Sequence, residues 1–349
     1  SATKVTEEVL DASANLKVVG RAGIGIDNVD IGAATKRGVV VMNTPHGNSV
    51  TAAEHAITMI LALARQIPEA NTSTKAGKWE KSRFVGTEIT GKTLGLIGCG
   101  NIGTVVAERA QGLKMRVVGY DPYLSSENAK QLGIEKLELN DLLKRADFIT
   151  LHTPLTDATR NIVNADALNK TKKGVRIINC ARGGLVDELA LAAALKSGHV
   201  AGAAFDVFEV EPAKDNVLFS FENVIATPHL GASTTEAQEK VALQIADQVS
   251  DYLIKGAIAN ALNMASVSAE EAPILKPYMT LGGLLGGFLG QVQADGATGI
   301  VIELDGKAAT LNPEPIVAAT LAGFLGPFME SVNMVNAAAV ASSNGIAVS

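Results

Sequence analysis

Cysteine and long apolar runs are scarce in this sequence of 349 residues, and each scarcity excludes a class of protein. The two cysteines, Cys99 and Cys180, are too few for a disulfide framework and fit a reducing compartment, so we expect a cytoplasmic protein. The longest apolar runs, residues 278–290 and 315–329, are shorter than the ~20 residues of a membrane-spanning helix, and Gly or Pro interrupts both. We therefore expect no membrane partner.

An excess of basic residues is also missing. The formal net charge is −6, whereas a nucleic-acid surface needs clustered Lys and Arg, so we expect no nucleic-acid partner. The composition, 47% hydrophobic and 19% charged with only 4% aromatic, is that of a globular protein. A chain of this length exceeds one ordinary core, so we expect two or three domains.

Short runs of Val, Ile and Leu alternate with helical patterns, which is typical of a parallel sheet covered on both faces. We predict strands at residues 17–21, 39–43, 94–97, 116–120, 148–151, 175–179, 201–205 and 224–226. The six strands from 94 to 226 would form one doubly wound sheet. A long helix is predicted over 49–67, with Thr51 and Glu54 as a capping box.

The remaining chain changes character. A second helix is predicted over residues 234–254, and after about residue 263 Gly and Ala increase. One strand is predicted there, residues 299–304, running into an Asp305-Gly306 turn. We interpret this tail as a separate domain.

The segment LGLIGCGNIG places Gly98, Gly100 and Gly103 in the spacing G-x-G-x-x-G, between an apolar strand and an amphipathic helix. Such glycines permit a tight turn, close approach of a pyrophosphate and helix-on-strand packing. Asp121 ends the next strand and would accept hydrogen bonds from the adenosine ribose, which favours NAD over NADP. The alternative is a glycine-rich turn with Asp121 as a helix cap.

Polar residues follow several predicted strands, where open parallel sheets bind their ligands. Arg182 follows one strand, Asp206 and then Glu211 the next, and His229 the last. Arg182 has a planar fork suited to a carboxylate, and His229 is the natural acid/base because the reference pKa of histidine is ~6.5. Glu211 would stabilise the imidazolium. This set predicts oxidation or reduction of a 2-hydroxy acid.

Other interpretations of these residues remain. Arg182 could be a surface residue before a glycine turn. Glu209 and Glu222 are alternatives to Glu211 as the acid that supports His229. Cys180 lacks a nucleophile's His partner, and no cluster has metal-ligand spacing, so we expect no metal. Of the other histidines, we expect His55 to pack or cap within a helix and His199 to be solvated. We expect His46 and His152 to lie on crevice loops, where they could contact a ligand.

The segments LGLIGCGNIG…VVGYD, KKGVRIINCARGGLVDE, DVFEVEP and PHLGAST resemble the signature segments of the D-2-hydroxyacid dehydrogenases. The resemblance covers residues 1 to 263. It implies a doubly wound Rossmann-type NAD domain inserted into a smaller flavodoxin-like substrate domain, plus a partial α/β regulatory domain at the C-terminus. The implied bounds are 1–45 with 234–263 for the substrate domain, 46–233 for the NAD domain and 264–349 for the partial intervening domain.

The resemblance also assigns roles by position. Arg182 binds substrate, Glu211 supports the histidine, and His229 donates or accepts the proton. The substrate's phosphate and carboxylate meet Arg21 and Asn48. The implied NAD contacts, beyond the three glycines, are Asn101, Ile102, Asp121, Thr153, Cys180, Ala181, Asp206, Leu230, Gly231 and Ala232.

The segments VVGRAGIGIDNVD, NTPHGNS and LARQIPEA…GKWE are most similar to members that oxidise 3-phosphoglycerate to 3-phosphohydroxypyruvate with NAD, the first step of L-serine synthesis. The alternatives are glyoxylate, hydroxypyruvate or D-lactate as substrate, or an NAD(H)-sensing interaction protein. The resemblance implies a homo-oligomer, a dimer or tetramer. An opening section of the substrate domain and a terminal serine-binding domain have no counterpart here, so we expect a fragment without serine feedback.

Overall fold

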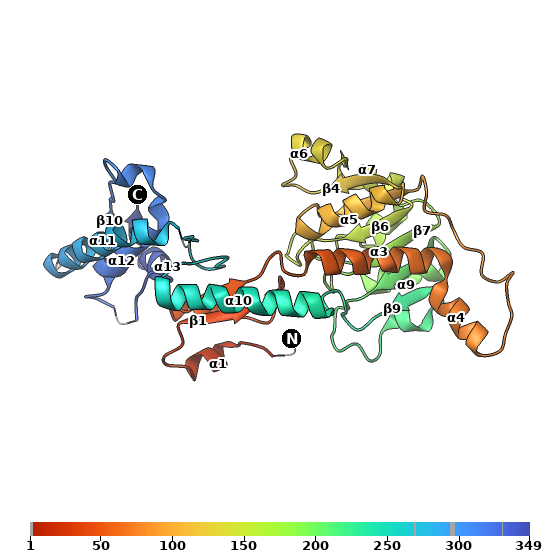
Figure 1. The fold of residues 1–349 in the computed structure, drawn as a ribbon, viewed down its shortest axis with the longest axis horizontal. Coiled ribbons are helices and arrows are strands. Elements are labelled where there is room, and N and C mark those ends of the chain that lie inside the picture. The colour runs from red at the N-terminus through yellow and green to blue at the C-terminus, as the bar shows by residue number, and fades with distance from the viewer. Residues whose placement is uncertain (1–2, 269, 294–296, 330) are drawn as a thin grey trace. The chain divides into compact units, whose positions relative to one another are not determined.

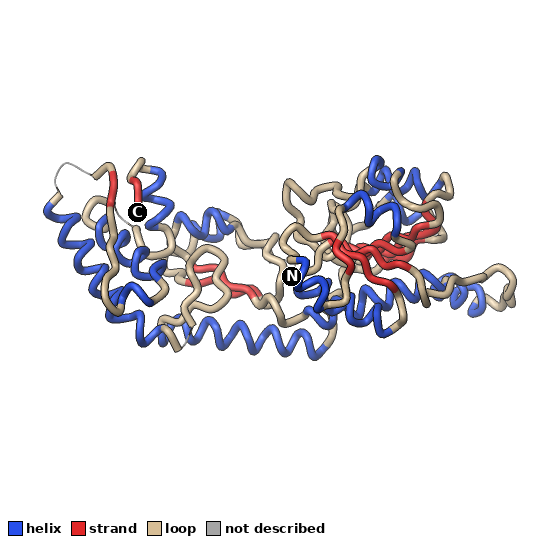
Figure 2. The backbone as a smooth tube through the Cα atoms, turned by 90° about the horizontal axis from the view of Figure 1, so that it is seen from above, coloured by secondary structure: helices blue, strands red, loops and turns tan. Residues whose placement is uncertain are grey.

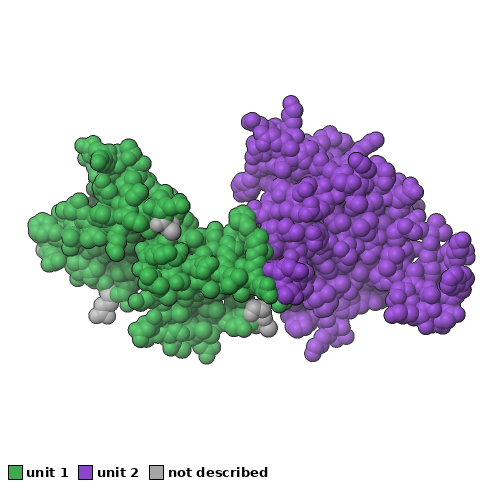
Figure 3. All heavy atoms as spheres, in the orientation of Figure 1, with its two compact units in different colours: residues 1–47, 238–349 green, residues 48–237 purple. Residues whose placement is uncertain are grey.

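The computed structural model describes residues 3–268, 270–293, 297–329 and 331–349. The chain forms two compact units, which Figure 3 draws in different colours: unit 1 comprises Ser1–Gly47 with Gln238–Ser349, and unit 2 comprises Asn48–Ala237. The predicted domain bounds remain a prediction. None of the helices in the described ranges is long and apolar enough to cross a membrane.

A parallel sheet of seven strands forms the centre of unit 2 (Figures 1 and 2). Its spatial order is β5-β4-β3-β6-β7-β8-β9, so the strand order reverses between β3 and β6, the kind of crevice where doubly wound sheets bind ligands. The strands are β3 (Thr93–Ile97), β4 (Arg116–Tyr120), β5 (Glu135–Lys136), β6 (Phe148–Leu151), β7 (Val175–Asn179), β8 (Val200–Phe205) and β9 (Val224–Ala226).

The six predicted strands of this sheet are confirmed, each to within one residue, but the seventh was missed. Strand β5 consists of two exposed charged residues at the sheet edge, paired with Val118 and Gly119 of β4. An edge strand that buries no side chain has no apolar run, so its sequence carries no strand signal.

Helices cover both faces of the sheet. Buried residues of α3 and α5 share one core cluster with Leu94, Leu96 and Phe148, whereas α7, α8 and α9 share the other with Ile97 and Ile149. The unit 2 helices are α3 (Ser49–Arg65), α4 (Ile67–Lys75), α5 (Asn101–Gly112), α6 (Ser126–Gln131), α7 (Leu139–Arg145), α8 (Ala165–Asn169), α9 (Glu188–Lys196) and the 3₁₀ turn η1 (Val217–Ser220).

The long helix α3 begins at the predicted Ser49, but its capping and its end differ from the prediction. The N-cap is Asn48, so Thr51 and Glu54 lie inside the helix and the predicted capping box is wrong. The Thr51 hydroxyl instead lies 3.4 Å from the hydroxyl of Thr234. Gln66 adopts a left-handed conformation with φ 51°, which ends α3 at Arg65, two residues before the predicted boundary, and separates it from α4.

Unit 1 contains a two-stranded parallel sheet in which β1 and β2 pair, as Val18 with Val40 through Arg21 with Asn43. Both strands were predicted to within one residue. The predicted second helix is confirmed as α10, shifted by one residue. Their bounds, with those of the short helices, are β1 (Val18–Arg21), β2 (Val40–Asn43), α1 (Glu7–Asp11), α2 (Ile31–Lys36) and α10 (Thr235–Lys255).

The tail is mostly helical. Val40 and Met42 of β2 share a core cluster with Leu275 and Ile316 of the tail. The predicted strand 299–304 is wrong beyond Ile300, because its partner β11 pairs with two residues only. The tail elements are α11 (Ala272–Val292), β10 (Gly299–Ile300), η2 (Ala308–Thr310), α12 (Pro313–Leu325), α13 (Ala337–Ser343) and β11 (Ala347–Val348).

Candidate active site

The glycine turn lies between β3 and α5. Gly98 has φ +95°, a conformation that L side chains rarely adopt. A Cβ on Gly103 would lie 2.1 Å from the carbonyl oxygen of Gly98, so the first turn of α5 packs directly on the loop. A Cβ on Gly100 would meet no protein atom within 4 Å. The backbone at Gly100 therefore faces open space, as a bound pyrophosphate requires.

Asp121 directly follows β4, beside this turn. Its carboxylate accepts hydrogen bonds from the N–H of Cys99 and the N–H of Tyr123, each at 2.8 Å. These two bonds orient the carboxylate and leave further lone pairs for ribose hydroxyls. A pocket of about 450 Å³ has Gly100, Asn101, Asp121 and Tyr123 among its lining residues. The open turn and the held carboxylate fit the adenosine half of a dinucleotide.

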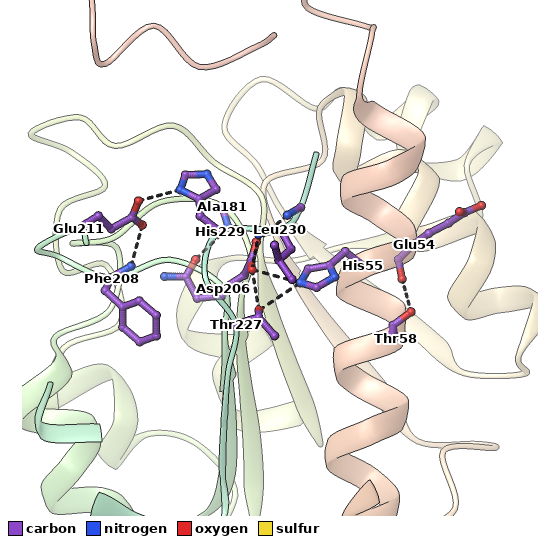
Figure 4. A network of polar contacts seen from close by, with 12 residues as sticks. Glu54, His55, Thr58, Ala181, Asp206, Phe208, Glu211, Thr227, His229 and Leu230 are labelled. Carbon is purple, nitrogen blue, oxygen red and sulfur yellow. Dashed lines mark hydrogen bonds and ion pairs between the residues drawn. The ribbon is translucent and has the colours of Figure 1, made fainter. Parts of the chain in front are cut away.

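His229 and Glu211 form a hydrogen-bonded pair. The Nδ1 of His229 lies 2.8 Å from Oε2 of Glu211, and Oε1 of Glu211 accepts a hydrogen bond from the N–H of Phe208 at 3.1 Å (Figure 4). Because an ionised carboxylate only accepts hydrogen bonds, Nδ1 carries a proton and donates it. Nε2 of His229 is then the nitrogen left to exchange a proton with a ligand. The side chains are 51% and 36% exposed, so solvent and small molecules reach the pair.

The backbone at His229 is held in an unusual conformation. Its φ is 57°, a left-handed value that is uncommon outside glycine and marks local strain. The N–H of His229 donates to the carbonyl oxygens of Asp206 at 2.8 Å and Thr227 at 3.0 Å. The surrounding structure therefore imposes the direction in which the imidazole points.

Asp206 anchors the loop that carries His229. Its side chain is completely buried and accepts hydrogen bonds from the Thr227 hydroxyl at 2.6 Å, the N–H of Leu230 at 2.7 Å and the N–H of Gly231 at 2.8 Å. Burial raises the pKa of this carboxyl, but bonds from His55, Thr227 and Leu230 outweigh it and keep the pKa below its usual value. Asp206 is ionised, and its predicted contact with NAD remains a prediction.

Arg182 follows β7, which is adjacent to β8 in the sheet. Its backbone carbonyl accepts from the side chain of Asn179, and its Nη1 donates to the carbonyl of Ala181 at 2.6 Å. A Cβ on Gly183 would lie 1.9 Å from the carbonyl oxygen of Phe208, so this turn packs against the segment that leads to Glu211. The turn of Arg182 and the His229–Glu211 pair both lie at the carboxyl edge of the sheet, and a meeting of the Arg182 side chain with His229 remains a prediction.

Two buried cysteines and His152 near this edge are unsuited to catalysis, whereas His199 directly precedes β8 at the opposite edge. Burial raises the pKa of the Cys180 thiol and raises that of Cys99 to about 12, so neither is a thiolate at neutral pH. Burial lowers the pKa of His152 to about 3, and its Nε2 lies 2.9 Å from the hydroxyl of Thr150. His199 was predicted to be solvated, but it is partly buried, with Nε2 3.0 Å from the Leu168 carbonyl oxygen. The solvated prediction is wrong.

His55 has a role that the sequence analysis missed. Its Nε2 lies 3.3 Å from Oδ1 of Asp206 and 3.3 Å from the hydroxyl oxygen of Thr227 (Figure 4). A signal was present, because His55 lies three residues after Ala52 and four before Met59, both buried. That spacing puts its imidazole on the face of α3 directed at the sheet.

The remaining predicted contacts lie as follows. Asn101 and Ile102 form the first turn of α5. Thr153 follows β6, and a Cβ on Gly98 would lie 2.8 Å from its methyl group, which places it against the glycine turn. Arg21 ends β1 in unit 1 and donates to the carbonyl of Ala22. Within the described residues, no group of three or more His, Cys, Asp or Glu side chains could hold a metal ion.

The model of the D-isomer specific 2-hydroxyacid dehydrogenase NAD binding domain matches residues 57–231, which include the glycine turn and the His229–Glu211 pair. The chain belongs to that dehydrogenase family. The D-3-phosphoglycerate dehydrogenase intervening domain model matches residues 274–349. The D-3-phosphoglycerate dehydrogenase of Bacillus subtilis (strain 168) is 47% identical over 350 residues, 100% of this chain and 67% of that protein. The Homo sapiens protein of that name is 50% identical over 286 residues, 82% of this chain and 54% of that protein.

Solved structures of D-2-hydroxyacid dehydrogenases share the fold of this chain. A glyoxylate reductase from Paecilomyes thermophila superposes with a TM-score of 0.70 at 32% identity, covering 74% of this chain and 79% of its own. A D-lactate dehydrogenase from Aquifex aeolicus, solved with NAD and lactic acid, gives 0.67 at 30% identity over 75% and 85% of the two chains. The chain spans two thirds or less of its D-3-phosphoglycerate dehydrogenase relatives, 67% of the Bacillus subtilis protein and 63% of the Synechocystis protein.

Proposed function

We propose that this D-2-hydroxyacid dehydrogenase oxidises 3-phosphoglycerate to 3-phosphohydroxypyruvate with NAD, the first step of L-serine synthesis. The observation that carries the chemistry is the 2.8 Å contact between His229 Nδ1 and Glu211 Oε2, which leaves Nε2 to receive a hydroxyl proton. The choice of substrate rests on the D-3-phosphoglycerate dehydrogenase relatives, which reach 44–50% identity.

The proposed reaction assigns separate roles to NAD, His229 and Glu211. NAD, when bound, accepts the hydride from the carbon that bears the hydroxyl. His229 takes the hydroxyl proton at Nε2, and Glu211 stabilises the resulting imidazolium through Nδ1. Such a base contributes about 10²–10⁴ in rate. In the reverse direction His229 returns the proton to the keto oxygen.

Substrate binding is assigned to cationic and amide side chains. Arg182 offers a planar fork for the carboxylate, beside the strand ends that carry Asp206 and His229. Arg21 and Asn48 are proposed to meet the phosphate and carboxylate. The Asn48 side chain makes no capping hydrogen bond to α3, which is consistent with a ligand contact.

The cofactor-binding residues follow the glycine turn. Gly98, Gly100 and Gly103 with the first turn of α5 hold the pyrophosphate, and Asp121 selects NAD by repelling a 2′-phosphate. The residues proposed for the remaining contacts are Asn101, Ile102, Thr153, Cys180, Ala181, Asp206, Leu230, Gly231 and Ala232. We further propose that the protein is cytoplasmic. We also propose that it is a homo-oligomer, either a dimer or a tetramer.

The decisive test is steady-state turnover of the purified chain with NAD and a panel of 2-hydroxy acids. We expect kcat/KM for 3-phosphoglycerate to exceed that for D-lactate and D-glycerate, because Arg21 and Arg182 supply two cations for a substrate with two anionic groups. A preference for the unphosphorylated acids would transfer the proposal to them. A folded, NADH-binding chain that turns over none of these acids would favour an NAD(H)-sensing interaction protein.

A further inference from the structure

The loop that carries His229 is tied to helix α3 through one side chain that no assigned role includes. His55 projects from α3 toward the strand ends, where its Nε2 lies 3.3 Å from both Oδ1 of Asp206 and the hydroxyl oxygen of Thr227 (Figure 4). The Thr227 hydroxyl itself donates to Oδ1 of Asp206 at 2.6 Å. The three polar groups form a closed triangle.

The direction of these hydrogen bonds follows from the chemistry. An ionised carboxylate is an acceptor, and the Thr227 proton is committed to it, so the remaining partner must donate. His55 therefore carries a proton on Nε2, directed at Asp206 and at the lone pair of the Thr227 oxygen. The imidazole is 18% exposed and Asp206 is 0% exposed, so water competes little for these bonds.

The position of His55 differs from that of the other donors to Asp206. Thr227, Leu230 and Gly231 all lie on the loop that Asp206 is holding. His55 comes from outside that loop, on a 17-residue helix that packs against β7, β8 and β9. The loop donors bind the Asp206 carboxylate to the loop, whereas His55 binds the same carboxylate to helix α3, which packs on the sheet of unit 2.

We propose that His55 is a positioning residue that, through Asp206, fixes the loop Thr227–Gly231 and so aims the imidazole of His229. The polar partners of His55 in the described structure are Asp206 and Thr227, so it acts on His229 only through the carboxylate. Without its N–H, a fully buried carboxylate loses a donor, and the left-handed backbone of His229 loses part of what imposes it. The expected change in kcat rests on the proposed function, whereas the expected loosening of the loop does not.

The test compares three variants of the full chain. His55→Leu keeps the volume and removes the donor, whereas His55→Gln keeps an N–H near the position of Nε2. Glu54→Gln, at the exposed neighbour on the same helix, is the matched control. We expect His55→Leu to lower kcat about 10-fold or more, because a small misplacement of a catalytic group is costly, with KM for NAD little changed. His55→Gln should stay within about 3-fold of the control, since it keeps a donor.

A second measurement needs no substrate. The Leu230 and Gly231 N–H groups donate to Asp206, so their hydrogen exchange should be faster in His55→Leu than in His55→Gln or Glu54→Gln. NADH binding, followed by its fluorescence, should be retained in all three variants, because the glycine turn that we propose holds the pyrophosphate is untouched. Equal kcat in His55→Leu and Glu54→Gln, or equal losses in the Leu and Gln variants, would overturn the inference. Faster exchange in a chain that turns over no 3-phosphoglycerate would reject the proposed substrate and keep His55 as a positioning residue.

Discussion

The imidazole of His229 and the carboxylate of Glu211 meet at 2.8 Å, although 18 residues separate them in the chain. Both follow ends of neighbouring parallel strands, Glu211 after β8 and His229 after β9. Glu211 is held by the N–H of Phe208, and His229 by the carbonyl of Asp206. The pair is therefore fixed from both sides before any ligand arrives, which is the arrangement an acid/base needs.

Replacing His229 with Ala should lower kcat by about 10²–10⁴, because it removes the imidazole that we propose takes the hydroxyl proton. NADH binding should be retained, since the glycine turn is untouched. Stopped-flow or steady-state absorbance of NADH measures the first effect and fluorescence titration the second. Loss of NADH affinity in the folded variant would assign His229 to the cofactor site instead.

Glu211→Gln removes the charge that faces the imidazolium and leaves an amide of the same shape. Charge-assisted hydrogen bonds are worth roughly 1–1.5 kcal/mol more than neutral ones, which corresponds to a fall in kcat of about 10-fold. Glu209→Gln is the matched control, because Glu209 is exposed two residues away, whereas the imidazole is paired with Glu211. Equal rates for the two variants would show that the charge of Glu211 plays no part.

Gly100→Ala and Gly103→Ala separate stability from cofactor binding. An added Cβ at residue 103 meets the Gly98 carbonyl oxygen at 2.1 Å, so Gly103→Ala should lower the free energy of unfolding by about 1–3 kcal/mol. At residue 100 the Cβ meets no protein atom within 4 Å, so Gly100→Ala should fold normally yet bind NAD more weakly. Urea unfolding and NADH titration read the two effects, and normal NAD affinity in Gly100→Ala would contradict the assignment of the pyrophosphate site.

Asp121→Ser should relax the preference for NAD over NADP. Removal of the carboxylate removes its repulsion of a 2′-phosphate, and like charges in contact cost several kcal/mol, so the NAD/NADP ratio of kcat/KM should fall about 10–100-fold. The matched control is Glu127→Ser, an exposed acid in the first turn of α6. An unchanged ratio in Asp121→Ser would place the discrimination elsewhere.

His152 should make the protein less stable as the pH falls below 7. Burial holds its pKa at about 3 in the folded chain, below the ~6.5 of an unfolded histidine, so the unfolded chain binds more protons between these values. Its stability contribution is complete above pH ~6.5 and declines as the pH falls toward 3, reaching a loss of up to about 2 kcal/mol between pH 7 and pH 5.

Urea unfolding at pH 7 and pH 5 checks the His152 prediction, in a range where most carboxylates stay ionised. His152→Gln keeps a polar group near Thr150 but has no proton to gain, so its stability should change less between the two pH values. His46→Gln is the control, because His46 is exposed. Identical pH dependence in His152→Gln and the unaltered chain would mean that His152 is not protonated on unfolding.

Much of the fold and the site could be predicted from local patterns. The eight strands predicted between residues 17 and 226 lie within one residue of their observed bounds, because buried parallel strands have continuous apolar runs. The polar residues after those strands lie at one edge of the sheet for the same topological reason. The tail was predicted less well: strand 299–304 shrank to Gly299–Ile300, since strand length depends on a partner distant in sequence.

The sequence by itself determined the cofactor turn, the strand ends and the pairing of an acid with His229, because spacing along strands and helices carries that information. Only the tertiary structure decided that Asp206 anchors the His229 loop and that His55 reaches it from α3, across 151 residues of chain. Hydrogen bonds between buried polar groups depend on how helices pack on a sheet. A helical period predicts that a side chain faces the core, but it does not identify the partner that the side chain contacts.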